Sequence, residues 1–84
     1  MLRLCHFDGI IITMDYMGHN PPHFHANYGE FDITVAIPSF RVKGSGFPTP
    51  KKRILLRWAE DNLEKLMECW EYASNGRKPP KISP

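Results

Sequence analysis

The 84-residue sequence has few cysteines and no long hydrophobic run. Its two cysteines, Cys5 and Cys69, lie near opposite ends of the chain and form no CxxC motif, so we expect a reduced setting in which both are small buried apolar residues. The longest apolar runs, such as residues 10–12, are far too short to span a bilayer. The first residues contain no basic region followed by an apolar stretch and a cleavage site, and we therefore expect a cytoplasmic protein without a membrane segment.

The sequence also has little net charge. A formal charge of +2 does not by itself predict a nucleic-acid-binding protein, so any such prediction depends on local clusters of basic residues. The hydrophobic content of 42%, with 12% aromatic residues, is typical of a globular chain and argues against disorder. We find no internal repeat, and the length suits one domain over residues 1–84 with a single modest core.

A turn motif near the N-terminus begins a predicted β-meander over residues 1–43. The pair Asp8-Gly9 lies between two apolar segments, residues 4–7 and 10–16. An Asp-Gly pair between β-forming residues is typical of a tight hairpin, because both positions tolerate a positive φ angle. These two segments are therefore predicted to be antiparallel neighbours.

A second turn, at Gly29-Glu30, predicts the pairing of residues 23–28 with residues 31–37. Side chains alternate along a strand, so this register sorts the two segments onto two faces. The apolar face consists of Phe24, Ala26, Tyr28, Phe31, Ile33 and Val35. The opposite face, which we call the histidine face, consists of His23, His25, Asn27, Asp32, Thr34 and Ala36.

A third turn, at Pro38-Ser39, extends the same pattern. If Ile37 meets Phe40 across this turn, Arg41 and Lys43 join the histidine face. Pro-Ser is not a favoured hairpin pair and proline lacks a backbone donor, so the turn chemistry fixes this register less firmly than the other two.

Residues 44–48 form a short Gly- and Pro-containing linker, and residues 49–76 are predicted to be helical, with Thr49 as the N-cap. One continuous helix would be long for so small a domain, so two helices that meet near Asp61 are the alternative. Apolar residues recur at helical spacing: Leu55, Ala59, Leu63, Leu66, Trp70 and Ala73. The predicted fold class is therefore α+β: an antiparallel meander of four to five strands, with this helical segment on its apolar face and the histidine face uncovered.

Residues 19–25, with the sequence HNPPHFH, carry three of the four histidines. Two prolines fix the backbone before a strand, so His23 and His25 should point to the same side, with His19 on the preceding loop. Imidazoles near neutral pH exchange protons, ligate metals or form hydrogen-bonded networks. All three interpretations remain open from the sequence.

Basic residues on the predicted sheet and at the start of the predicted helix favour a phosphate-bearing substrate. If His23 and His25 exchange protons as catalytic residues and His19 assists them, the same surface could cleave RNA without a metal. The basic, proline-rich tail, residues 77–84, cannot be helical and is either solvated or follows a phosphate backbone. The predicted phosphate-binding residues are Arg41 and Lys43 on the sheet and Lys51, Lys52 and Arg53 at the start of the helix.

Two further interpretations need no RNA. A His-x-His pair on a strand presents two nitrogens to one side, and a zinc site with an open position would use His19, His23, His25 and Asp32. A non-enzymatic interaction module would instead dock its partner on the exposed sheet face or on the acidic part of the helical segment. That part contains Glu60, Asp61, Glu64, Glu68 and Glu71. Trp58, which lies off the apolar stripe, is predicted at the margin of the sheet or in a partner interface.

The order of these motifs resembles a small prokaryotic family, domain-of-unknown-function family 4160. The motifs that carry the resemblance are HNPPHFH at residues 19–25, Tyr28-Gly29-Glu30, Trp58-Ala59-Glu60 and Trp70-Glu71. The family has no settled activity, but its members are often encoded beside another small domain, in an arrangement similar to type II toxin–antitoxin pairs. The resemblance therefore implies a toxin-like member with a small antitoxin-like protein partner. It supplies His19, Pro21, Pro22, His23 and His25 as motif positions, without a role for any of them.

Overall fold

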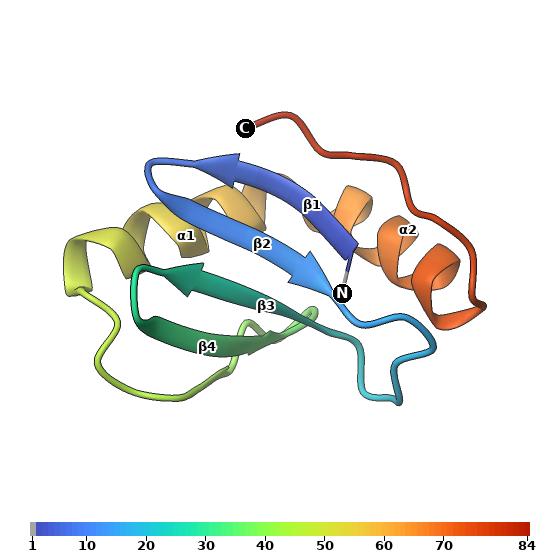
Figure 1. The fold of residues 1–84 in the computed structure, drawn as a ribbon, viewed down its shortest axis with the longest axis horizontal. Coiled ribbons are helices and arrows are strands. Elements are labelled where there is room, and N and C mark those ends of the chain that lie inside the picture. Colours follow the sequence, from blue (N-terminus) through green and yellow to red (C-terminus); the bar gives the residue numbers. More distant parts are fainter. Residues whose placement is uncertain (1) are drawn as a thin grey trace.

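A computed structural model describes residues 2–84, which form a five-stranded sheet followed by two helices (Figure 1). The strands run antiparallel in chain order, so each strand pairs with the next one in the sequence. This confirms the predicted α+β meander and gives it five strands. The elements are β1 (Leu2–Phe7), β2 (Ile10–Met14), β3 (His23–Tyr28), β4 (Phe31–Ala36), β5 (Val42–Lys43), α1 (Thr49–Asp61) and α2 (Leu63–Ser74).

The first two turns are as predicted. Asp8 and Gly9 both have positive φ angles, +48° and +76°, as a tight hairpin between β1 and β2 requires. Gly29 has a φ angle of +59° at the turn between β3 and β4. The register of β3 on β4 is confirmed along its whole length, from Tyr28 opposite Phe31 to His23 opposite Ala36.

The third turn differs from the prediction. Lys43 lies opposite Thr34 as expected. However, Ile37 and Phe40 do not pair: the Ile37 N–H donates to the carbonyl oxygen of Pro22, and the Phe40 N–H donates to that of Ala36. A two-residue hairpin needs positive φ angles that Pro-Ser does not supply, so the loop is wider and Phe40 itself adopts a φ of +59°.

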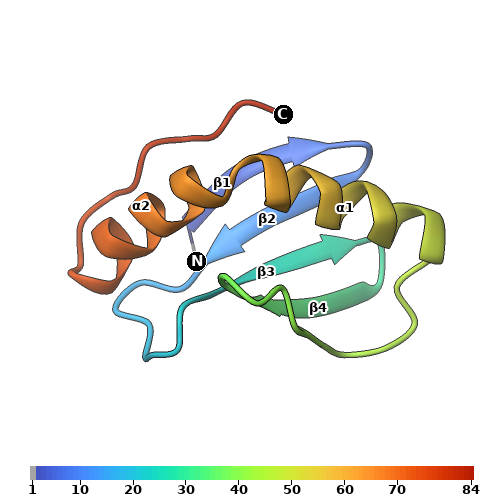
Figure 2. The ribbon, with the colours of Figure 1, turned by 180° about the vertical axis from the view of Figure 1, so that it is seen from behind.

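Both helices cover the apolar face of the sheet (Figure 2). The helical segment is divided at Asn62, which confirms the alternative of two helices. Asn62 ends α1 rather than capping α2 by its side chain: its Nδ2 and its backbone N–H both donate to the carbonyl oxygen of Trp58, at 2.8 and 3.0 Å. At its other end, α1 begins at Thr49, and Pro48 occupies the N-cap position that was predicted for Thr49.

The core between the two layers includes a residue that was predicted elsewhere. Trp58 is buried, with ring centroids 5.0 Å from Phe7 and 6.3 Å from Phe24, so the predicted position at a sheet margin or partner interface is wrong. Trp58 extends the apolar stripe of α1 because it lies one helical turn from Leu55. No helix within residues 2–84 is long and apolar enough to cross a membrane.

The C-terminal tail packs against the domain instead of extending into solvent. The Ile82 N–H donates to the carbonyl oxygen of Leu4 across 2.9 Å, so the tail follows the free edge of β1 (Figure 1). Ile82 and Pro79 are buried. The thiol of Cys69 donates to the carbonyl oxygen of Pro80. The tail therefore covers one edge of the sheet and one end of the core.

Candidate functional site

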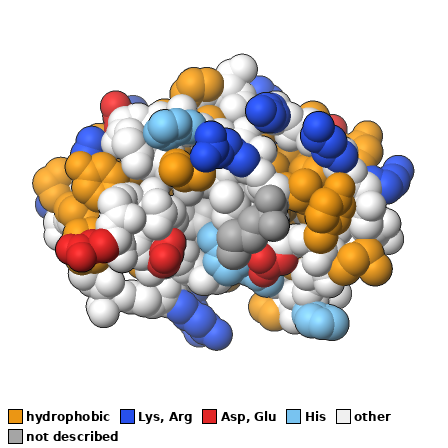
Figure 3. Space-filling view, in the orientation of Figure 1, with side chains coloured by type: hydrophobic (Ala, Val, Ile, Leu, Met, Phe, Trp, Pro, Cys, Tyr) orange, Lys and Arg blue, Asp and Glu red, His pale blue; other side chains and the backbone are white. Residues whose placement is uncertain are grey.

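The face of the sheet turned away from the helices carries the histidine motif (Figure 3). Strand pairing aligns one row of side chains across four strands: Thr13, His25, Thr34 and Lys43. A second row lies two residues further along each strand, because alternate residues share a face. It contains His23, Ala36 and Arg41, whose carbonyl oxygen accepts a hydrogen bond from the Ala36 N–H.

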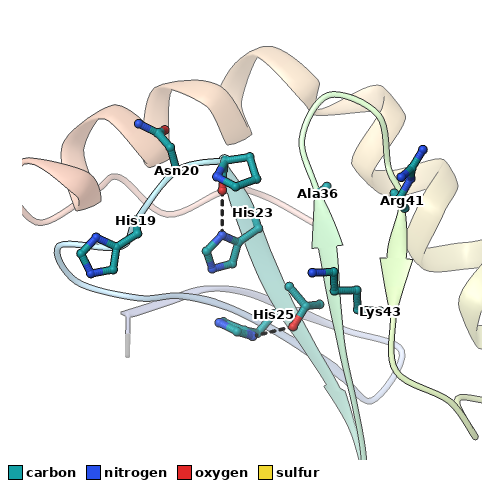
Figure 4. Close-up of a pocket in the computed structure, with 9 residues that line it drawn as sticks. His19, Asn20, His23, His25, Ala36, Arg41 and Lys43 are labelled. Carbon is teal, nitrogen blue, oxygen red and sulfur yellow. Dashed lines mark hydrogen bonds between the residues drawn. The ribbon is translucent and has the colours of Figure 1, made fainter.

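A cavity of about 370 Å³ lies over these rows (Figure 4). It brings together the three histidines of the motif and the two predicted cations of the sheet. Figure 4 shows Lys43 extending across β4 toward His25, while His19 comes from the loop on the other side. The lining residues are His19, Asn20, Pro21, His23, His25, Thr34, Ala36, Arg41 and Lys43.

Asp15 is the residue of this site that sequence reasoning missed. Its Oδ2 lies 3.0 Å from His25 Nε2 and 3.6 Å from His23 Nε2. The placement follows from the register, because Thr13 on β2 lies opposite His25 and Asp15 comes two residues later on the same face. The sequence alone does not give this register, because residues 15–22 form a loop of no defined turn type between β2 and β3.

Both nitrogens of His25 face an oxygen. Nε2 contacts the Asp15 carboxylate at 3.0 Å, and Nδ1 lies 3.3 Å from the hydroxyl of Thr34. The hydrogen bond from His25 holds the pKa of the Asp15 carboxyl below its ordinary value. The positive charges of protonated His25 and His23 act in the same direction, and partial burial opposes them.

His23 is oriented by the backbone. Its Nδ1–H donates to the carbonyl oxygen of Pro21 at 2.9 Å, since a carbonyl oxygen only accepts. In the neutral ring the proton is therefore on Nδ1, and Nε2 keeps a lone pair that faces Asp15. The ring also contacts Trp70 of α2, with centroids 5.2 Å apart.

Trp70 supports the loop between β2 and β3, which carries Asp15 and His19. A Cβ atom added at Gly18 would lie 2.9 Å from Trp70 Cη2, so the loop approaches the indole as closely as only glycine allows. The Met17 N–H donates to the carbonyl oxygen of Ala73 at 2.9 Å, which fixes the same loop to the end of α2. Helix packing on one face of the sheet thus positions side chains on the other.

Several predicted site residues lie elsewhere. Lys51 is at the start of α1, near the Asp8-Gly9 turn and the opposite end of the strands from His23, and its Nζ donates to the carbonyl oxygen of Asp8 at 3.0 Å. Lys52 and Arg53 follow it on the same helix turn, and none of the three lines the cavity. Asp32 accepts a hydrogen bond from Asn27 Nδ2 at 2.8 Å and does not join the histidines.

The arrangement has two chemical capabilities. His23 Nε2 can accept a proton, and it lies beside a cavity that the basic side chains of Arg41 and Lys43 line. In addition, one ligand atom each from Asp15, His23 and His25 lies within 4.8 Å of the others, close enough for a shared metal ion. The structure thus groups Asp15, rather than the predicted Asp32, with the two histidines; His19 lines the cavity but is not part of this cluster.

Comparisons with known proteins identify a family. The family model described as a domain of unknown function (DUF4160) matches residues 9–71, which include the histidine motif, Asp15 and most of both helices. Searches of curated proteins and of solved structures found no significant match.

Proposed function

This chain belongs to the DUF4160 family, and we propose that it binds RNA through the histidine face as the toxin-like member of a toxin–antitoxin-like pair. The family description assigns no activity, so the proposal depends on the site. The observation that carries the proposal is that Arg41, Lys43 and the three histidines of the motif, His19, His23 and His25, line the same cavity. The pairing with a second protein comes from the family resemblance.

The two cations supply the phosphate contacts. Arg41 and Lys43 are exposed, and each comes from the edge of the sheet beside β4. Arginine binds phosphate oxygens in a bidentate fork, and lysine acts as a mobile point charge. Neither the tail nor the start of α1 is needed for this contact, so the proposal assigns phosphate binding to the sheet pair alone.

The histidines add a proton acceptor to the same surface. His23 presents an Nε2 lone pair, and Asp15 stabilises positive charge on either ring. Cleavage of an RNA phosphodiester by its own 2′-hydroxyl requires a base for that hydroxyl, a donor for the leaving oxygen and cations for the developing charge. His23 takes the first role in this proposal, protonated His25 or His19 the second, and Arg41 with Lys43 the third.

Salt-dependent binding of a short single-stranded RNA tests the phosphate assignment. We expect the double variant R41Q/K43Q to bind more weakly and to reduce the slope of log affinity against log salt by about 1.4, because two phosphate contacts are lost. The matched control K52Q/R53Q removes the same charge from the start of α1. Equal effects of the two variants would contradict the proposal, since only net charge would then matter.

The acidic side of the helical layer favours a second role, as a docking surface for a basic protein partner. Glu60 at the end of α1 and Glu64 and Glu68 on α2 are all exposed. Glu64 and Glu68 are at i, i+4 spacing, and like charges at this spacing destabilise a helix. A cationic partner relieves that repulsion. The half-buried Leu63 and Met67 lie next to them and offer apolar contact area.

Size-exclusion chromatography with the product of the neighbouring gene tests this docking surface. We expect a complex that the double variant E64K/E68K abolishes and that R41Q/K43Q leaves intact. A complex that survives charge reversal on α2 would place the partner elsewhere. Loss of the complex in R41Q/K43Q would assign the sheet face to the partner instead of to RNA.

A further inference from the structure

We infer that Asp15, His23 and His25 bind a divalent transition-metal ion, with zinc as the representative ion. This inference goes beyond the proposed function and does not depend on it, because it concerns the protein without RNA. The sequence predicted a site of His19, His23, His25 and Asp32. The structure instead groups His23 and His25 with Asp15, which lies in the loop between β2 and β3.

The distances between the donor atoms fit one ion. Zinc bonds to nitrogen and oxygen of about 2.0–2.1 Å put tetrahedral ligand atoms about 3.3 Å apart. Asp15 Oδ2 lies 3.0 Å from His25 Nε2 and 3.6 Å from His23 Nε2. All three donor atoms lie within 4.8 Å of one another. The three side chains are 21–39% exposed and therefore have room for the small movement that would bring the atoms to bonding distance of one ion.

The hydrogen bonds behind the histidines match those that metal-ligating histidines make. A ligating histidine almost always donates its other N–H to an oxygen, which fixes the tautomer and the ring orientation. His23 donates from Nδ1 to the carbonyl oxygen of Pro21, and His25 Nδ1 faces the Thr34 hydroxyl. When His25 Nε2 ligates a metal, its proton moves to Nδ1 and donates to Thr34. Both rings then present Nε2 to the same carboxylate.

The contact between His23 and Asp15 calls for a cation. At 3.6 Å the two atoms are too far apart for a hydrogen bond, and the neutral His23 ring has no proton on Nε2. A lone pair then faces a carboxylate oxygen, which is unfavourable unless a positive charge lies between them. A proton on His23 relieves this repulsion, and so does a metal ion bound by both atoms.

The ligand types select the class of metal. Two imidazoles and one carboxylate suit zinc and the other divalent first-row transition ions, whereas magnesium and calcium prefer oxygen ligands alone. Three protein ligands leave at least one coordination position open, and the adjoining cavity contains Lys43 and Arg41. A phosphate oxygen or a water molecule can occupy that position. In the metal-bound protein, His23 Nε2 would be a ligand and would no longer accept a proton.

The test uses untagged protein treated with EDTA and dialysed, followed by zinc titration in a calorimeter and cobalt titration by visible absorption. We expect one equivalent of zinc per chain and a cobalt spectrum typical of nitrogen and oxygen ligands. D15N and H23A should each weaken zinc binding by more than about 100-fold, since each removes a ligand directly. T34V should weaken it about 10-fold, as expected for loss of a supporting hydrogen bond.

His6 provides the matched control. It is exposed on β1, pairs with Ile11 and takes no part in the cluster, so H6A should bind zinc as the unmodified chain does. NMR spectra of each variant show whether it is folded. Binding of much less than one equivalent by the unmodified chain overturns the inference. Equal losses in H6A and H23A overturn it as well, because zinc would then bind histidines without regard to this geometry.

Discussion

The His23 ring donates from Nδ1 to the carbonyl oxygen of Pro21, two residues earlier, across 2.9 Å. This one contact determines which nitrogen of His23 faces the site. It depends on the proline-rich turn that precedes β3, so the prolines of the HNPPHFH motif set the chemistry of the histidine that follows them. Both proposals, proton acceptance and metal binding, use the nitrogen that this contact leaves available.

The tautomer of His23 is the first prediction. In metal-free protein at a pH where the ring is neutral, long-range proton–nitrogen NMR correlations should show the proton on Nδ1, because the Pro21 carbonyl oxygen accepts it. Exposed His6 is the internal reference. A proton on Nε2 of His23 would show that the Pro21 contact does not form in solution.

The second prediction concerns Gly18. A Cβ atom there would lie 2.9 Å from Trp70 Cη2 and 3.1 Å from Cζ3, so G18A must displace either the loop or the indole. Overpacking of this kind costs about 1–3 kcal/mol of the free energy of unfolding, which urea denaturation measures. Because the loop carries Asp15, the NMR signals of His23 and His25 should shift as well. An unchanged unfolding midpoint would mean that loop and helix are not in this contact.

The third prediction concerns the docked tail. I82A should lower the free energy of unfolding by about 2 kcal/mol, since Ile82 is 5% exposed and lies beside β1. I54A removes the same atoms from a side chain that is 39% exposed on α1, and its effect should stay within about 0.5 kcal/mol. Equal effects in urea denaturation would contradict the docking of residues 77–84.

The fourth prediction concerns alkaline pH. Burial raises the pKa of the Cys69 thiol from 9.0 to about 11, with the Glu68 carboxylate adding to the shift. Above pH 9 the unfolded chain loses this proton while the folded chain keeps it. The contribution of Cys69 to the free energy of unfolding is therefore fully present below pH 9 and decreases as the pH rises toward 11. The unfolding midpoint of the unmodified chain should fall more steeply than that of C69A between these values. Parallel curves would contradict the assignment.

Much of the site could be predicted because local chemistry determines it. The Gly29-Glu30 turn and the two-residue alternation fixed the pairing of His25 with Thr34, and with it the shared face of the histidines. Lys43 was placed correctly even though the turn before it was not. The wider loop does not change the register of β5 on β4. The Ala36 N–H donates to the carbonyl oxygen of Arg41, so these two residues lie opposite each other as predicted.

Asp15 was missed because the loop between β2 and β3, residues 15–22, does not fix a register by its length or its turn type. Only the packing of that loop on Trp70 and the pairing of β2 with β3 bring Asp15 to His25. The docking of Ile82 was missed for a related reason. A contact between the last residues and Leu4 is nonlocal, and no turn or periodicity in the tail indicates it.

The most direct test of the central claim is an NMR titration of ¹⁵N-labelled protein with a short single-stranded RNA. The account predicts that the largest shifts fall on the histidine face and the adjoining cations, at His23, His25, Thr34 and Lys43, while the start of α1 changes little. Shifts concentrated at the start of α1 or in residues 77–84, or no shifts at RNA concentrations well above that of the protein, would contradict it.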